Sequence, residues 1–336
     1  MAATKINIDW ITSLFPNGTP PVATKWNGAG MTIEMKCAAG SVPGSYSVAY
    51  DSYLILHDGL ENHTLTLILK LNLNPYIPTG VLPAMRMPVL DADNRVFLAR
   101  PFTNAEWTKF VADFKRECFN WRRQFWLVPP QGYKGFDVKV GPRTMRPNIY
   151  CNLFIDVVNQ ASSAHSTINV VNLDGNDAST RLGFTEQNLR AGAFRSHATL
   201  YSNYDKDPNR QLTTPDNAGG QTQVNNFSTI AHEIGHALGL PHIGVTHKDP
   251  LCNMAALLQR TLPAGSTVPA IFNGGTNSNA CYGHLALPER GANIMGGGMT
   301  WHASNAAPWA ARIALHTFTT PSDWSVSTSK LPPQAV

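Results

Sequence analysis

Histidine and glutamate side chains with metal-binding spacing occur together in one short stretch of this 336-residue chain. Residues 231–242 read AHEIGHALGLPH, which places His232 and His236 four positions apart. Side chains four positions apart on a helix project from the same face. Two imidazole nitrogens on one face can share a zinc ion, and Glu233 between them can reach a water molecule on that metal.

Two further residues extend this pattern to H-E-x-x-H-x-x-G-x-x-H. Gly239 can adopt a positive φ, so the chain can turn sharply out of the helix at this point. After such a turn His242 can return to the metal as a third ligand. Three protein ligands and one open position are typical of a catalytic zinc ion. The alternative is an amphipathic core helix with surface histidines, but the third histidine and the glycine argue against it.

At these residues the chain resembles the metzincin clan of zinc endopeptidases. The sequence of this helix is most similar to the active-site helix of serralysins and matrix metalloproteases. The clan also has a tight methionine-bearing turn beneath the zinc, the Met-turn. Asn293-Ile294-Met295-Gly296 resembles that turn, and Met299 is the alternative methionine. The resemblance implies that Met295 forms an apolar floor below the metal and takes no part in proton transfer.

One clan feature is absent from this sequence. Astacins and serralysins carry a tyrosine two residues after the Met-turn methionine, whereas this chain has Gly297 there. The family within the clan is therefore not assigned, and the transition-state donor must come from another cleft residue. Three candidates remain open, namely Tyr282, His284 and His302.

The motif and the resemblance together predict a zinc-dependent endopeptidase. His232, His236 and His242 are expected to bind one catalytic Zn²⁺, which lowers the pKa of its water and polarises the scissile carbonyl. Glu233 is expected to accept the proton of this water and to pass it to the leaving amine. Two alternatives stay open: a zinc hydrolase acting on a non-peptide bond, and a zinc-stabilised binding or delivery module without protease activity.

The composition of the chain indicates where the protein acts and which kinds of partner it binds. Charged residues make up only 14% of the chain, which favours an exported or extracellular protein, with an effector or toxin-like protease as one option. The first residues lack the pattern of a signal peptide. The net charge of +4 is spread along the chain, so we expect no nucleic-acid partner. No apolar run is long enough for a membrane span. The oligomeric state stays open.

Two weaker metal and redox features accompany the main motif. The loop that begins at Asp174 could bind Ca²⁺ through carboxylate and carbonyl oxygens, but such loops are usually only turns. Cys252 and Cys281 bracket the segment before the Met-turn, so a disulfide bridge there is one of two open alternatives. Cys118 lies on the apolar face of a predicted helix and is expected to be a core residue.

The pattern of apolar residues predicts the elements that position the site. Strands are expected at 63–75, 136–140, 148–157, 166–171 and 196–202. A capping box at Thr103 and Glu106 opens a long helix, whose apolar stripe runs from Trp107 to Phe125. A polar loop over 203–225 precedes the zinc helix, which Asn225 or Asn226 should cap. A last helix is expected near 306–318.

These elements predict an α+β fold. The resemblance implies a metzincin-like zincin with a mixed twisted sheet, a long backing helix, an active-site helix and a small irregular C-terminal half ending in a helix. The predicted domains are a β-rich extension or arm (1–60) and a catalytic domain (61–336), divided into an upper part (61–242) and a lower part (243–336). The resemblance also implies that a peptide substrate pairs as an extra strand with the cleft edge at 196–202.

Overall fold

The structure is a computed structural model. It describes residues 23–26, 32–35, 44–47, 50–80, 82, 84–90, 96–173, 200–202, 211–215, 222–240, 293–295 and 298–336.

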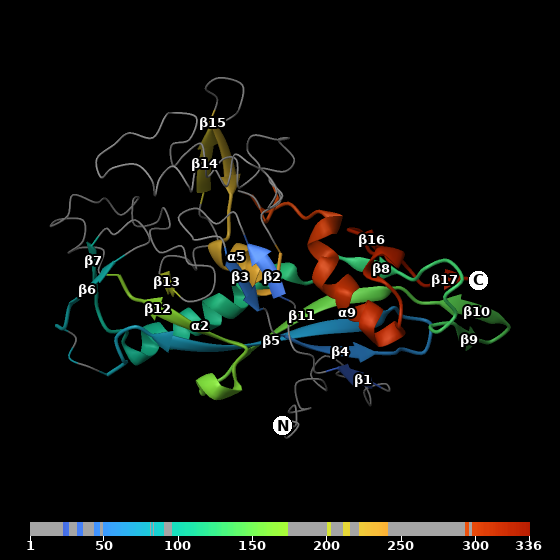
Figure 1. Ribbon diagram of the computed structural model, residues 1–336, viewed down its shortest axis with the longest axis horizontal. Coiled ribbons are helices and arrows are strands. Elements are labelled where there is room, and N and C mark those ends of the chain that lie inside the picture. The colour runs from blue at the N-terminus through green and yellow to red at the C-terminus, as the bar shows by residue number, and fades with distance from the viewer. Residues whose placement is uncertain are drawn as a thin grey trace.

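An eight-stranded mixed sheet forms the centre of the described fold (Figure 1). Its main path runs β1-β4-β5-β11-β8-β16, and β12 joins β5 to β13. β5 is parallel to β11 and β12 and antiparallel to β4. The strands are β1 (Ala23–Trp26), β4 (Asp51–Ile55), β5 (His63–Pro75), β8 (Trp126–Val128), β11 (Ile149–Val157), β12 (Ser166–Val171), β13 (Leu200–Ser202) and β16 (Ser325–Ser327).

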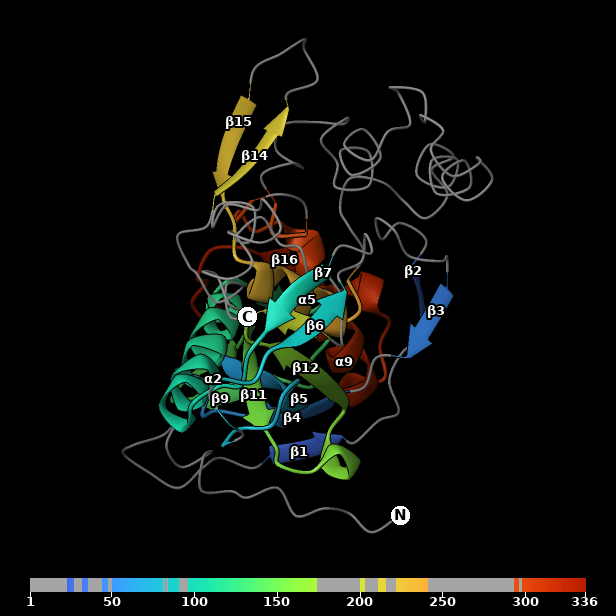
Figure 2. The same cartoon turned by 90° about the vertical axis from the view of Figure 1, so that its left-hand side faces the viewer.

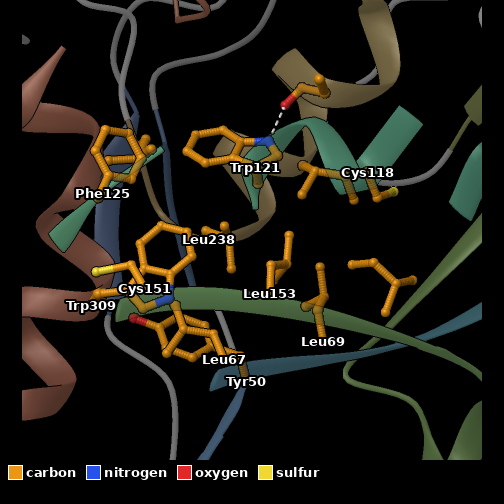
Figure 3. Close-up of a cluster of buried hydrophobic side chains, with 14 of the residues drawn as sticks. Tyr50, Leu67, Leu69, Cys118, Trp121, Phe125, Cys151, Leu153, Leu238 and Trp309 are labelled. Carbon is orange, nitrogen blue, oxygen red and sulfur yellow. Dashed lines mark hydrogen bonds between the residues drawn. The ribbon is translucent and has the colours of Figure 1, made fainter. Parts of the chain in front are cut away.

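The alternating sequence of β5 explains how the sheet builds the core. Leu65, Leu67 and Leu69 project to one face and are at most 1% exposed. In the parallel register Leu67 lies beside Leu153 of β11, so both strands present leucines to the same layer. Figure 3 shows Leu67, Leu69 and Leu153 in one cluster with Trp121 and Trp309, which come from the helical layer.

Among the described residues, three α-helices pack against this sheet: α2 (Asn104–Cys118), α5 (Thr229–Ala237) and α9 (Ala307–Thr317). Their buried side chains join those of the sheet in one hydrophobic cluster. Figure 2 shows α5 between α2 and α9 when the molecule is viewed from the side. The short helix α5 therefore lies in the middle of the helical layer, where its neighbours fix its orientation.

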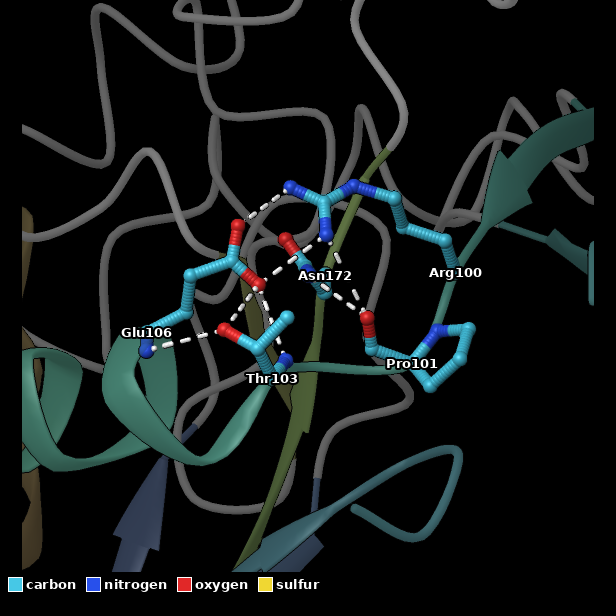
Figure 4. Close-up of polar contacts among 5 residues, drawn as sticks. All are labelled: Arg100, Pro101, Thr103, Glu106 and Asn172. Atoms are coloured by element: carbon cyan, nitrogen blue, oxygen red, sulfur yellow. Dashed lines mark hydrogen bonds and ion pairs between the residues drawn. The ribbon is translucent and has the colours of Figure 1, made fainter. Parts of the chain in front are cut away.

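The predicted capping box at the start of α2 is confirmed. The Thr103 hydroxyl accepts from the Glu106 amide, and the Glu106 carboxylate accepts from the Thr103 amide. Arg100 adds a two-pronged ion pair to the same carboxylate, and Asn172 at the end of β12 donates to the Pro101 carbonyl (Figure 4). The hydrogen bond from Arg100 is the main reason that the pKa of Glu106 falls to about 2.

The long apolar stripe is only partly α-helical. The helix ends at Cys118, and a 3₁₀ turn follows at Phe119–Trp121. Arg123 then adopts a left-handed conformation with φ of 61°, which breaks the helical path. Trp121 and Phe125 are nevertheless fully buried, so their apolar character marks core positions beyond the helix.

Several shorter strands and turns were not predicted or were predicted differently. The segment 203–225, expected as a loop, contains most of a hairpin, in which β14 pairs with β15. The strand expected at 136–140 shortens to β9 and joins a separate small sheet. The remaining elements are β2 (Thr32–Met35), β3 (Gly44–Ser47), β6 (Met87–Leu90), β7 (Val96–Ala99), β9 (Val138–Val140), β10 (Arg143–Arg146), β14 (Gln211–Pro215), β15 (Thr222–Asn226), β17 (Gln334–Ala335) and the 3₁₀ turns η2 (Ala161–Ser163), η4 (Ala303–Ala306) and η5 (Pro321–Asp323).

Both ends of the chain contribute strands to the main sheet. β1 and β4, from the segment predicted as an N-terminal extension, pair with each other, and β4 pairs with β5. β16 follows the last helix and pairs with β8. The fold is thus a mixed sheet with few helices, compatible with the predicted α+β class. No helix among the described residues has the length and apolar character to cross a membrane.

Candidate metal centre

The helix that carries the predicted metal ligands begins one turn before them. Ser228 is the N-cap, because its hydroxyl accepts from the Ala231 amide at 3.2 Å. The predicted caps Asn225 and Asn226 were wrong, since both belong to β15 and pair with β14. The Ser228 hydroxyl also donates to the buried Glu117 carboxylate at 3.0 Å, which ties the start of α5 to α2.

His232 and His236 lie on one face of α5, as their spacing predicts. Both imidazoles are 1% exposed, and their Nε2 atoms are 3.2 Å apart. Nδ1 of His232 lies 2.6 Å from the carbonyl oxygen of Ile294. Nδ1 of His236 lies 2.7 Å from the carbonyl oxygen of Leu240. Each ring is thus held at one nitrogen by a backbone carbonyl.

These contacts determine where the ring protons are. A carbonyl oxygen only accepts, so Nδ1 of each histidine carries the proton and donates it. In two neutral rings both Nε2 atoms then present lone pairs to each other. At 3.2 Å the two nitrogens are close enough to share one metal ion.

The geometry fits a zinc ion. Two nitrogens, each about 2.0–2.1 Å from a tetrahedral zinc, are separated by about 3.3 Å, close to the 3.2 Å between the Nε2 atoms. Metal-binding histidines usually donate their other ring proton to a carbonyl or carboxylate, which fixes the ring. His232 and His236 both have such a carbonyl partner.

The remaining residues of the motif are partly described. Glu233 is 4% exposed and occupies the middle of α5. Gly239 has φ of +94°, which confirms the predicted sharp turn after the helix. His242 lies outside the described residues, so the placement of the third predicted ligand is not part of the structure. Within the described part of the chain, no group of three metal-binding side chains occurs.

The turn that contains Met295 is fixed by buried polar contacts. Asn293 is 1% exposed, and its side-chain oxygen accepts from the Met295 amide at 2.8 Å. Its side-chain nitrogen donates to Asn305 at 3.0 Å. The Ile294 amide donates to the Thr300 carbonyl, which closes the turn. Because the Ile294 carbonyl holds His232, this turn and the histidine pair form one connected unit.

Met295 packs directly against α5. It is fully buried, and its sulfur and methyl group occupy the space that a side chain at Gly235 would need. Trp121 lines the same space, and its indole nitrogen donates to the Ala231 carbonyl at 2.8 Å. Gly235 therefore allows the methionine and the tryptophan to approach the helix backbone between the two histidines.

The other predicted site residues are distributed differently. Met299, the alternative methionine, accepts from the Ser228 amide through its sulfur and so contacts the start of α5. His302 is exposed and caps η4 by accepting from the Ser304 amide. Tyr282 and His284, the Ca²⁺-loop candidate at 174–177, and the half-cystine candidates Cys252 and Cys281 lie outside the described residues. Cys118 is fully buried, as predicted.

Four residues that support the centre were missed in the sequence. They contact the ligand helix or the turn through buried side chains: Glu117, Trp121, Asn293 and Asn305. Trp121 was predicted only as a core residue. Asn293 could have been found, because an asparagine two residues before a methionine can bond the backbone of that methionine in a turn.

Comparisons with protein-family models, curated proteins and solved structures find no match to this chain.

Proposed function

We propose that this protein is a zinc-dependent endopeptidase that hydrolyses peptide bonds of protein substrates. The observation that carries the proposal is the pair of Nε2 atoms, 3.2 Å apart, on rings whose Nδ1 atoms are both held by backbone carbonyls. Such an arrangement fixes the rotation and the tautomer of both imidazoles before the metal binds. The two side chains therefore lose less conformational entropy when the metal binds.

The proposed roles follow from the chemistry of each side chain. His232, His236 and His242 hold the metal through neutral imidazole nitrogens. Zinc supplies a nucleophile at neutral pH by lowering the pKa of its water, and it polarises the scissile carbonyl. Glu233 accepts a proton from the attacking water and passes it to the leaving amine, which requires a carboxylate within hydrogen-bond reach of both. Met295 closes the site from below and keeps bulk water from the histidine pair.

Substrate binding is proposed at the open strand edge of the main sheet. β13 pairs with β12 on one side, and no other described strand pairs with it. An extended peptide can add to such an edge through main-chain hydrogen bonds, which makes recognition partly independent of sequence. This part of the proposal predicts cleavage within extended or unfolded segments rather than at one fixed sequence.

The test uses the purified full chain. Zinc content is measured by atomic emission, and cleavage of a denatured protein is followed by mass spectrometry. We expect about one zinc per chain and cleavage that a chelator stops and added zinc restores. Glu233→Gln should retain zinc and lose at least about 10²-fold in cleavage rate.

The matched control is Glu61→Gln, an exposed glutamate whose side chain is 76% accessible. This variant should cleave as fast as the unmodified protein. Full activity of Glu233→Gln would exclude the assigned base, and unchanged zinc content in His232→Ala would exclude the assigned ligands. Stoichiometric zinc with no cleavage of any protein substrate would contradict the endopeptidase proposal and favour a zinc-stabilised binding module.

A further inference from the structure

A cavity lies on the sheet face opposite to the helices. Its floor is formed by Thr64 of β5, Tyr150 of β11 and Trp126 of β8, which are neighbours in the strand register. The next residue of each strand, such as Leu65 or Cys151, is buried in the hydrophobic core. Because side chains alternate along a strand, the cavity opens on the other face of the sheet and shares no residue with the metal centre.

The walls of this cavity are fixed. The segment Leu331, Pro332 and Pro333 and the loop at 57–62 both line it. Asn62 donates to the Leu331 carbonyl, and Asn148 donates to the Pro332 carbonyl at 2.8 Å. The volume is 660 Å³, within the roughly 300–1,000 Å³ of small-molecule sites. A cavity with walls held in this way is preformed, as most ligand sites are.

The charges at the cavity favour an anion. Arg123 and Lys330 line it, and neither cationic group makes a hydrogen bond or ion pair with another described residue. Glu61 is the one lining carboxylate, and it points largely into solvent near His57. Burial lowers the pKa of His57, so this imidazole is neutral at neutral pH and leaves the net charge of the lining positive.

The uncharged polar groups favour a ligand with few hydroxyl groups. Asn62 bonds Asn148 and Leu331, and Thr64 lies 3.3 Å from Nε2 of His57. The Tyr150 hydroxyl accepts from the Arg123 amide at 3.1 Å. Asn62 and Thr64 already have protein partners, whereas the Tyr150 hydroxyl can still donate one hydrogen bond. Trp126 is only 8% exposed, so the apolar surface that remains for a ligand is mainly Leu60, the ring of Tyr150 and the proline wall, which suit a flat apolar body.

We propose that this cavity binds a small amphiphilic anion, a carboxylate attached to a flat ring. The ring lies against Tyr150 and the proline wall, and the carboxylate lies between Arg123 and Lys330. An arginine fork matches a carboxylate with two parallel hydrogen bonds, and the lysine adds a second positive charge. This site is independent of the proposed protease activity, because it uses different residues on the opposite face of the sheet.

The experiment measures binding of naphthalene-2-carboxylate to the full chain by isothermal titration calorimetry and saturation-transfer NMR. The uncharged naphthalene-2-carboxamide and the hydroxylated acid N-acetylneuraminate serve as comparison ligands. We expect one carboxylate per chain, with at least about tenfold weaker binding of the amide and of the sugar acid.

The variants are chosen to preserve the fold. Arg123→Asn removes the charge, and asparagine tolerates the left-handed backbone at this position. Lys330→Gln removes the second charge, and Lys134→Gln alters an exposed lysine outside the cavity as a matched control. Arg123→Asn should weaken carboxylate binding at least about tenfold, Lys330→Gln should weaken it less, and Lys134→Gln should leave it unchanged.

Three results with the unmodified chain would overturn the proposal. They are the absence of carboxylate binding at millimolar concentration, equal binding of the carboxylate and the amide, and tighter binding of the sugar acid. If all three variants bound the carboxylate with the same affinity, the ligand would not lie in this cavity. Circular dichroism of each variant separates loss of binding from loss of fold.

Discussion

Nδ1 of His232 lies 2.6 Å from the carbonyl oxygen of Ile294, so the ligand helix and the methionine turn share a hydrogen bond. The two residues are 62 positions apart in the sequence. The proton on Nδ1 leaves Nε2 as the nitrogen that faces His236. The orientation of a predicted metal ligand therefore depends on the exact conformation of a turn in the last part of the chain.

Asn293→Ala should destabilise this turn. The substitution leaves the buried Met295 amide without its partner, at about 1–3 kcal/mol, and removes one of the two hydrogen bonds that the Asn305 side-chain oxygen accepts, at about 1 kcal/mol. We expect a total loss of about 2–4 kcal/mol in the free energy of unfolding, measured by chemical denaturation. Zinc affinity should fall as well, because the Ile294 carbonyl moves with the turn. A variant with normal stability and normal zinc affinity would contradict this role of Asn293.

Gly235→Ala should also be destabilising, although alanine is the better helix former by about 1 kcal/mol. The added methyl group meets the sulfur of Met295 and the ring of Trp121, so the side chains must move. Overpacking of this kind costs about 1–3 kcal/mol.

The double variant Gly235→Ala/Met295→Ala gives the control, because it vacates the space that the methyl group needs. In a double-mutant cycle the two substitutions should be non-additive, with the pair more stable than the sum of the single losses. Additive losses would show that Gly235 and Met295 do not compete for the same space.

Ser228→Asp should lower the stability of the fold, although aspartate is generally as good an N-cap residue as serine. Here the cap oxygen lies 3.0 Å from the buried Glu117 carboxylate, so a second carboxylate is repelled. Ser228→Asn, which can both accept from Ala231 and donate to Glu117, is the matched control. We expect the aspartate variant to be less stable than the asparagine variant by at least about 2 kcal/mol at neutral pH in thermal or denaturant unfolding. Equal stabilities would contradict a charged Glu117 at this contact.

Stability should fall as the pH decreases from 6.5 to 4, and His316 should contribute to this fall. Burial, with a smaller contribution from Arg312, lowers the pKa of His316 to about 4. In the unfolded chain His316 therefore takes up a proton near pH 6.5, whereas in the folded chain it takes up this proton only near pH 4. The stabilisation is complete above pH 6.5 and is lost between these values, up to about 3 kcal/mol.

His316→Gln isolates this contribution from that of other titrating groups. Glutamine can keep the contact that His316 makes with the Ser52 hydroxyl, but it does not titrate. The difference in unfolding free energy between pH 7 and pH 4 should be smaller in the variant than in the unmodified chain. An identical pH dependence would exclude the lowered pKa.

The parts of the fold that were predicted best have long and regular apolar patterns. The bounds of β5 and β12 agree with the predicted strands, because alternation over many residues leaves one register that buries the apolar face. The hairpin at 211–226 was missed because its strands are polar and carry no such alternation. β16 was missed because a three-residue strand has too few positions to show a period.

The candidate site was predictable only where its geometry is local. Two histidines on one helical face follow from spacing alone, and the positive φ at Gly239 follows from the residue type. The carbonyl partner of His232 comes from the distant Ile294, and the anchor of the cap comes from Glu117 on another helix. Contacts of this kind depend on how separate elements pack, which no local pattern encodes.

The C-terminal wall of the carboxylate cavity has a consequence for the order of folding. Asn62 bonds Leu331, which lies 269 positions later in the chain, and β16 (Ser325–Ser327) pairs with the much earlier β8 (Trp126–Val128). During synthesis the pairing of β4 with β5 can form as soon as β5 emerges, whereas this rim closes only after nearly all described residues have left the ribosome. Loop-closure entropy makes such late, long-range contacts slow to form. A nascent chain therefore passes through a stage with β8 as an uncovered sheet edge, the stage at which a chaperone would bind and at which self-association would begin.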